Sequence, residues 1–325
     1  MKIIILFLSL CFHLYCFCQT NFINDSVAIL GADNTLMLRE IFPDINLHEI
    51  PYSAVLYNVN SGMVEKTVPG LNINHVDVSN NLNILSALGN EVEKDSNGHI
   101  KIRRPGHEGL LILSCDLRIL SSIDSVTAYS WDNNKESIVY IKGYRLQEKP
   151  MFVSTGVYIL NVKDNKSEKI GDFGFDVSWQ IYDNNIYIKD TNGVFVYDTK
   201  LRTLTKTEYW GIYFSADGIF YLNPAYEGAG IDIYKTQSNE IVKIDNLDSK
   251  NPSFFKWIGK DELIIGDVIL EKKIIKISNR KIQKTFSGKI FGYNSRTVEI
   301  YVYKDKRFFK ELADSKIEKF KYPSE

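Results

Sequence analysis

Four histidines are the residues of this chain whose type and spacing first suggest chemistry. His48, His75, His99 and His107 all lie within one stretch, positions 48–107. Imidazole is a common metal ligand and also titrates near neutral pH, which suits acid–base catalysis. Two interpretations stay open: a divalent-metal or acid–base site, or polar loops that carry histidine because they are polar. None of the four shows the short spacing of a known ligand pair.

Other motifs of catalysis and cofactor binding are absent from the sequence. It contains no phosphate-binding loop, nucleophile elbow, zinc-ligand pair or EF-hand loop. Cys115 ends the apolar run GLLILSC, so we expect a buried thiol rather than a nucleophile. The sequence therefore predicts no cofactor, and an enzymatic function would depend on the histidines.

Short strands are the elements that must position these histidines. Runs such as SAVLYNV from Ser53, SIVYIKGY from Ser137 and VEIYVY from Val298 alternate apolar and polar residues, which is the period of a strand. Turns rich in Asn, Asp and Gly separate the strands, as at Asp183 and Asp217. These turns recur roughly every 40 to 45 residues, and we expect little helix.

A repeat of this length with four strands is typical of a β-propeller blade. The chain has 325 residues and is 44% hydrophobic and 13% aromatic, which suits a soluble all-β protein with a sizeable core. We predict a single all-β propeller domain over residues 19–325. Seven four-stranded blades are favoured and six stay open. A pair of β-sandwiches and a β-solenoid are the alternatives.

Four tryptophans support the phase of the repeat. Trp131, Trp179, Trp210 and Trp257 each fall in or beside the first strand of a predicted blade, just before its first turn. A bulky aromatic side chain at this place would fill the space between neighbouring blades.

The candidate binding residues are expected to lie at one end of the predicted blades. In a propeller, the second-to-third strand connections and the blade-to-blade connections lie on one face. We expect long connections there at residues 39–52, 89–108, 143–155 and 222–230, and arginine and aromatic residues favour recognition. The candidates on this face are His48, His75, His99, Arg103, Arg104, His107, Tyr144, Arg145, Phe152, Tyr226 and Glu227.

One repeat resembles the TolB-type propeller repeat. The stretch YFSADGIFYL from Tyr213 matches that family's aromatic–Ser–Pro–Asp–Gly pattern at Phe214, Ser215, Asp217 and Gly218, while Ala216 replaces the proline. The resemblance implies the propeller fold. Some TolB-like propellers are lyases with a histidine-bound metal on the same face, but their ligands match no residues here.

The N-terminus predicts export. Lys2 is followed by a short apolar run, and Cys16 and Cys18 occupy the small-residue positions of a signal peptide spanning residues 1–18. An uncleaved anchor and a lipoprotein are the alternatives. We expect a periplasmic, cell-surface or secreted protein with no integral membrane domain after cleavage. The formal net charge of −1 argues against a nucleic-acid partner.

These observations favour a binding module over an enzyme. We expect a monomer that recognises a protein, peptide or glycan through the face that carries the long connections. The alternative is a metal-assisted lyase or hydrolase that acts on a polysaccharide fragment. It requires at least three of the four histidines to converge on one ion.

Overall fold

The structure is a computed structural model of the 325-residue chain. It describes residues 22–31, 53–79, 81–145, 152–224, 231–245, 247, 254–258, 260–266, 271–287, 289–294, 299–304, 307–312 and 317–319. The predicted signal peptide, residues 1–18, lies outside this part of the chain. Every element in the described part is a β-strand, which confirms the all-β prediction. The described residues contain no helix of the length and apolar character that a membrane span requires.

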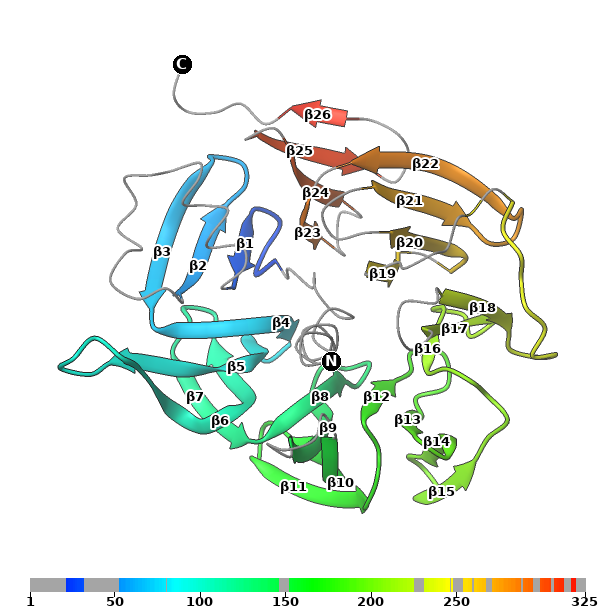
Figure 1. The fold of residues 1–325 in the computed structure, drawn as a ribbon, viewed down its shortest axis with the longest axis horizontal. Coiled ribbons are helices and arrows are strands. Elements are labelled where there is room, and N and C mark those ends of the chain that lie inside the picture. The colour runs from blue at the N-terminus through cyan, green and yellow to red at the C-terminus, as the bar shows by residue number, and fades with distance from the viewer. Residues whose placement is uncertain are drawn as a thin grey trace, which may run out of the picture. The chain divides into compact units, whose positions relative to one another are not determined.

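The described strands form seven antiparallel sheets, which we name A to G in chain order (Figure 1). Within the described residues, five sheets have four strands, and sheets A and E have three. In every sheet, strands that follow one another in sequence are neighbours. The repeat predicted from the turns is therefore a succession of sheets, each built from one continuous stretch of chain.

The chain divides into two compact units, and sheets A, B and G belong to the unit of residues 17–125 and 287–325. Sheet A consists of β1 (Val27–Leu30), β2 (Ser53–Asn58) and β3 (Met63–Pro69). Sheet B consists of β4 (Leu71–Ser79), β5 (Ile84–Lys94), β6 (Ile100–Ser114) and β7 (Ile119–Asp124). Sheet G consists of β23 (Lys289–Asn294), β24 (Glu299–Lys304), β25 (Arg307–Leu312) and β26 (Ile317–Lys319).

Sheets C to F belong to the unit that includes residues 126–286. Sheet C consists of β8 (Val126–Trp131), β9 (Ser137–Arg145), β10 (Phe152–Asn161) and β11 (Lys166–Gly171). Sheet D consists of β12 (Asp176–Trp179), β13 (Ile186–Asp190), β14 (Gly193–Asp198) and β15 (Thr203–Lys206). Sheet E consists of β16 (Tyr213–Phe214), β17 (Phe220–Pro224) and β18 (Ile231–Lys235). Sheet F consists of β19 (Phe254–Trp257), β20 (Glu262–Gly266), β21 (Glu271–Lys276) and β22 (Lys281–Ser287).

Alternation along the strands builds the core between sheets C, D and E. Ile186 and Ile188 of β13 pack with Val139 and Ile141 of sheet C. Tyr187 lies between them in sequence and packs in a separate cluster with residues of sheet E. Successive side chains of a strand point to opposite faces, so one strand contributes to two apolar layers. Sheet D is buried on both faces for this reason.

Tight turns join the first two strands of most sheets where the sequence predicts them. In sheet D, the Asp183 carboxylate accepts the Asn185 N–H at 3.0 Å. In sheet E, Gly218 has a φ of 71°, a left-handed conformation that favours glycine. A Cβ atom at Gly218 would lie 2.5 Å from the Tyr182 ring of the neighbouring turn. These turns therefore also pack against one another.

The stretch 89–108 differs from its prediction as a long connection. β5 and β6 continue through most of it and pair from Ile84↔Ser114 to Lys94↔Ile100, with irregularities near Glu91. β4 stops pairing at Glu91, so the end of this hairpin extends beyond its own sheet. The turn is confined to residues 95–99. The interpretation as a loop is wrong because polar residues here face water from a two-stranded extension.

Candidate functional site

The predicted binding-face residues are described to different extents. His48, Tyr226 and Glu227 lie outside the described part of the chain. His75, His99, Arg103 and Tyr144 are described in full, and Tyr144 is 51% exposed near the end of β9. The backbone alone is described for Arg104, His107, Arg145 and Phe152.

His99 lies at the tip of the β5–β6 hairpin. Its side chain is 78% exposed, and its Nδ1 is 3.4 Å from the Asp95 carboxylate. Asp95 accepts the backbone N–H groups of Asn97 at 2.8 Å and of His99 at 2.9 Å. The His99 N–H in particular lowers the pKa of the Asp95 carboxyl. This arrangement closes the turn, as aspartate commonly does in turns.

His75 lies far from His99 in the same sheet. It is half-buried on β4 at an irregularity in the pairing with β5, and its φ is 49°. The register places it beside Ala87, about eight residues from the hairpin turn, or roughly 26 Å at 3.3 Å per residue. These two imidazoles therefore cannot share an ion.

A metal site would then need His48, His107 and either His75 or His99 as ligands of the same ion. Within the described residues, no group of three or more His, Cys, Asp or Glu side chains is arranged to hold a metal ion. The histidine site stays a prediction from the sequence.

A second set of polar residues, which the sequence analysis missed, lies between sheets D and E. Asp176 begins β12 and is the cross-strand partner of Lys189 on β13. The Tyr213 hydroxyl of β16 donates to Asp176 Oδ2, and the Val177 N–H donates to Oδ1 at 2.9 Å. Lys189 Nζ donates to Asn223 Oδ1 of β17 at 2.8 Å. We call Asp176, Lys189, Tyr213 and Asn223 the D–E polar cluster.

Strand direction places this cluster at the end of each sheet where the second strand joins the third. Lys189 and Asp190 close β13 just before the turn to β14, and Asn223 and Pro224 close β17. This is the end at which the propeller prediction places the binding face. All four residues are half-buried.

Burial perturbs both charged groups of the cluster. It raises the pKa of the Asp176 carboxyl, an effect that the Tyr213 hydroxyl and the Val177 N–H oppose. It lowers the pKa of the Lys189 ammonium, and the Asp176 carboxylate opposes this shift. Burial disfavours the charged form of each group. Perturbed titratable groups that reach the surface are typical of functional sites.

Aromatic residues of sheet F support the cluster. The Tyr213 and Phe255 rings meet edge to face, with centroids 5.0 Å apart. The Trp257 indole N–H donates to the Tyr213 carbonyl at 3.0 Å. These contacts hold the Tyr213 ring and thus direct its hydroxyl toward Asp176.

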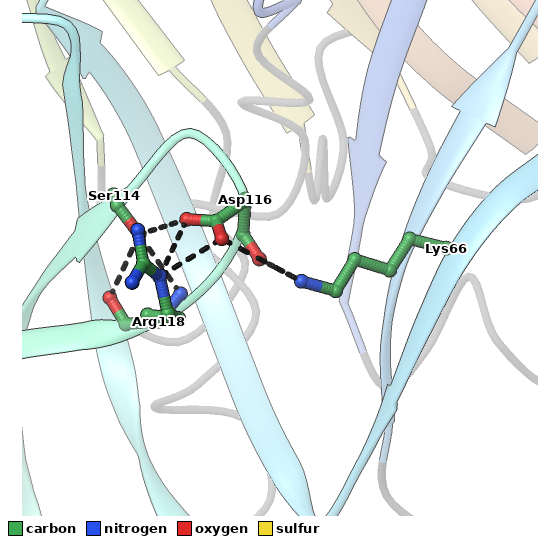
Figure 2. Close-up of polar contacts among 4 residues, drawn as sticks. All are labelled: Lys66, Ser114, Asp116 and Arg118. Carbon is green, nitrogen blue, oxygen red and sulfur yellow. Dashed lines mark hydrogen bonds and ion pairs between the residues drawn. The ribbon is translucent and has the colours of Figure 1, made fainter.

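A further polar network lies in sheet B, at the end opposite the β5–β6 hairpin tip (Figure 2). The Asp116 carboxylate lies 2.9 Å from Arg118 Nε and accepts the Ser114 hydroxyl within the β6–β7 turn. Lys66 of β3 donates to the Asp116 carbonyl at 2.5 Å and so links sheet A to sheet B. The Ser114 and Arg118 bonds lower the pKa of the Asp116 carboxyl. Its partners are residues of the turn itself and Lys66 of the neighbouring sheet A, so we assign this network a structural role.

Cys115 lies in the same turn. Its thiol donates to Asn83 Oδ1 at 3.2 Å, and burial raises its pKa. A raised pKa keeps the thiol protonated at neutral pH, which argues against a nucleophile.

Comparison with solved structures decides the architecture. The structure of U3-55K superposes with a TM-score of 0.56 at 11% sequence identity and covers 88% of each chain. The C-terminal WD40 domain of Sif2 gives a TM-score of 0.53 at 13% identity, over 92% of this chain and 83% of that one. The fold is a β-propeller. At these identities the likeness shows the propeller fold alone.

The propeller matches no protein-family model, and no curated protein matches its sequence. The TolB-type repeat is thus not among the matches, whereas the propeller fold that the resemblance implied is confirmed.

Proposed function

We propose that this propeller is an exported binding module that recognises its ligand through the sheet ends bearing the second-to-third strand connections. The observation that carries the proposal is the D–E polar cluster. It places a carboxylate, an ammonium, a hydroxyl and an amide at one such end, half-buried and with hydrogen-bonding capacity left for a ligand. Rigid strands position all four groups, which limits the entropy that binding must overcome.

The hairpin tip of sheet B supports the same interpretation. Ile100 and Ile102 are 43% and 41% exposed, and the Arg103 guanidinium lies 3.7 Å from the Glu93 carboxylate. Exposed aliphatic residues beside an arginine suit a contact surface. The hairpin tip of sheet B is therefore a second candidate surface for ligand contact.

The proposal includes the compartment, the domain and the oligomeric state: a signal peptide over residues 1–18, one propeller domain over residues 19–325 and a monomer. The TolB-like pattern from Phe214 to Gly218 supports the propeller domain.

Affinity capture tests this function. The purified protein and a variant carrying Thr191→Gly and Asn192→Gly in the exposed β13–β14 turn would be used as baits with the exported fraction of the source cells. We expect a ligand that the wild type retains and the variant loses. A matched Leu201→Gly variant at the opposite end of sheet D should retain it. Equal retention by all three proteins would contradict the proposed face.

A further inference from the structure

We propose that the D–E polar cluster is a carbohydrate-binding site that takes the hydroxyl groups of an uncharged glycan. This inference rests on the proposed function and names the ligand class of the same face. It follows from the hydrogen-bonding groups of the cluster, their charges and their spacing.

The first observation is unused hydrogen-bonding capacity. A lysine ammonium has three N–H donors, and Asn223 Oδ1 accepts one of them at 2.8 Å. Within the described part of the chain, Lys189 has no second acceptor. Each Asp176 oxygen accepts one hydrogen bond and has a lone pair left. The cluster therefore keeps both donors and acceptors that no described protein group uses.

The second observation is charge balance. Asp176 and Lys189 are cross-strand partners, but the ammonium bonds to Asn223 rather than to the carboxylate. An anionic ligand would be attracted to Lys189 and repelled by Asp176, and a cation would experience the reverse. The pair thus has no net charge to select a charged ligand, whereas a neutral group that both donates and accepts satisfies both residues.

The third observation is spacing. Cross-strand partners in an antiparallel sheet have Cα atoms about 4.5 to 5.5 Å apart. The two side chains therefore leave neighbouring backbone positions, and a ligand that contacts both must present a donor to Asp176 and an acceptor to Lys189. One hydroxyl oxygen, or two neighbouring hydroxyls, does both. A peptide unit presents its N–H and C=O in opposite directions, so it fits this pair less well.

An aromatic side chain completes the chemistry of the site. The Tyr213 hydroxyl bonds to Asp176, its ring packs on Phe255, and its backbone carbonyl accepts from Trp257. The ring also packs against apolar clusters of sheets D, E and F, so it fixes the position of the hydroxyl in the site. Burial of Asp176 and Lys189 strengthens hydrogen bonds to a ligand, because the local dielectric constant is lower than in water.

Calorimetric titration with neutral tetrasaccharides of glucose, xylose, mannose and galactose tests the inference. We expect saturable binding of at least one of them. Its affinity should be the same in about 50 mM and about 500 mM salt, because no net charge is neutralised. Lys189→Met and Asp176→Asn should each weaken binding roughly 10-fold or more, as expected for a hydrogen bond to a charged group.

Lys200→Met is the matched control. Lys200 is exposed in the turn at the opposite end of sheet D, so its loss should leave affinity unchanged. Circular dichroism and thermal melting verify that each variant is folded. Wild-type affinity in folded Lys189→Met would overturn the inference.

A second outcome separates this inference from the proposed function. If none of the tetrasaccharides binds but a captured protein is lost on Lys189→Met, the glycan inference is wrong and the binding face stands. If no tetrasaccharide binds and capture is the same for every variant, both proposals fall.

Discussion

At the residue scale, burial shifts the pKa values of Asp176 and Lys189, raising that of the carboxyl and lowering that of the ammonium. Each loses solvent, and each has a neutral hydrogen-bond partner, Tyr213 or Asn223, in place of an ion-pair partner. Such an arrangement opposes stability, because desolvating a charge has a cost that a neutral partner only partly offsets. A ligand that uses the remaining hydrogen-bonding capacity would offset this cost.

Asp176→Asn should stabilise the protein at neutral pH. The folded-state pKa of Asp176 lies above its unfolded value, so ionisation favours the unfolded chain. This penalty is fully present above the folded-state pKa and absent below the unfolded value of about 3.9. Urea unfolding at pH 7 should show a higher free energy of unfolding for the variant. At about pH 3 the difference should vanish, and a lower stability at pH 7 would contradict the assignment.

Tyr187→Phe should destabilise the aromatic layer between sheets D and E. The Tyr187 hydroxyl donates to Asp183 at 2.8 Å and lies 2.6 Å from the Tyr182 hydroxyl. Its loss removes the hydrogen bonds to Asp183 and Tyr182 at a partly buried site, which costs about 1–2 kcal/mol. Tyr197→Phe is the control, because the Tyr197 hydroxyl makes no hydrogen bond within the described residues. Equal unfolding free energies for the two variants would rule out this role for the network.

The sequence alone could not predict the D–E polar cluster. Asp176 and Lys189 are paired by a register within sheet D, but Tyr213 and Asn223 come from the next sheet. A weak signal was available, since Lys189 interrupts the apolar run of β13. Its significance depends on which residues face it across two sheets, and that is set by tertiary packing.

At the element scale, turn chemistry was the most predictable feature. The residues at Asp183 and Asp217 form turns as predicted, because Asp, Asn and Gly accept the backbone conformations that tight hairpins need. Residues 89–108 were less predictable, because Gly and Asn residues there lie within or beside paired strands. Local turn preference is overridden there by cross-strand pairing, which no local pattern reveals.

Gly218→Ala tests the packing between turns. The substitution places a methyl group 2.5 Å from the Tyr182 ring and also forces a positive φ on alanine. Gly98→Ala is a matched control, because Gly98 also has a positive φ but nothing lies within 4 Å of its Cβ position. Chemical denaturation should show Gly218→Ala to be less stable than Gly98→Ala by about 1–3 kcal/mol. Similar losses for both would mean that strain, not packing, dominates.

At the scale of the whole molecule, apolar layers between successive sheets stabilise the propeller. The layers that join sheets C, D and E bury both faces of sheet D. The repeat length in the sequence anticipated this architecture, because each sheet is one continuous segment. Sequence identities of 11% and 13% to propellers of known structure show how little of the sequence the fold constrains.

Export predicts a defined mature N-terminus. If residues 1–18 are a signal peptide, the purified exported protein begins at Gln19. N-terminal sequencing or intact-mass analysis measures this directly. A chain that still begins at Met1 would instead support the uncleaved anchor.

Photo-crosslinking tests the central claim, ligand recognition through one end of the sheets, most directly. A photoreactive amino acid would replace Asn192 in the β13–β14 turn or, in a second protein, Leu201 at the opposite end of sheet D; both positions are exposed. After incubation with the exported fraction, we expect a specific crosslinked product from position 192 and none from position 201. A product from position 201 alone would contradict the account.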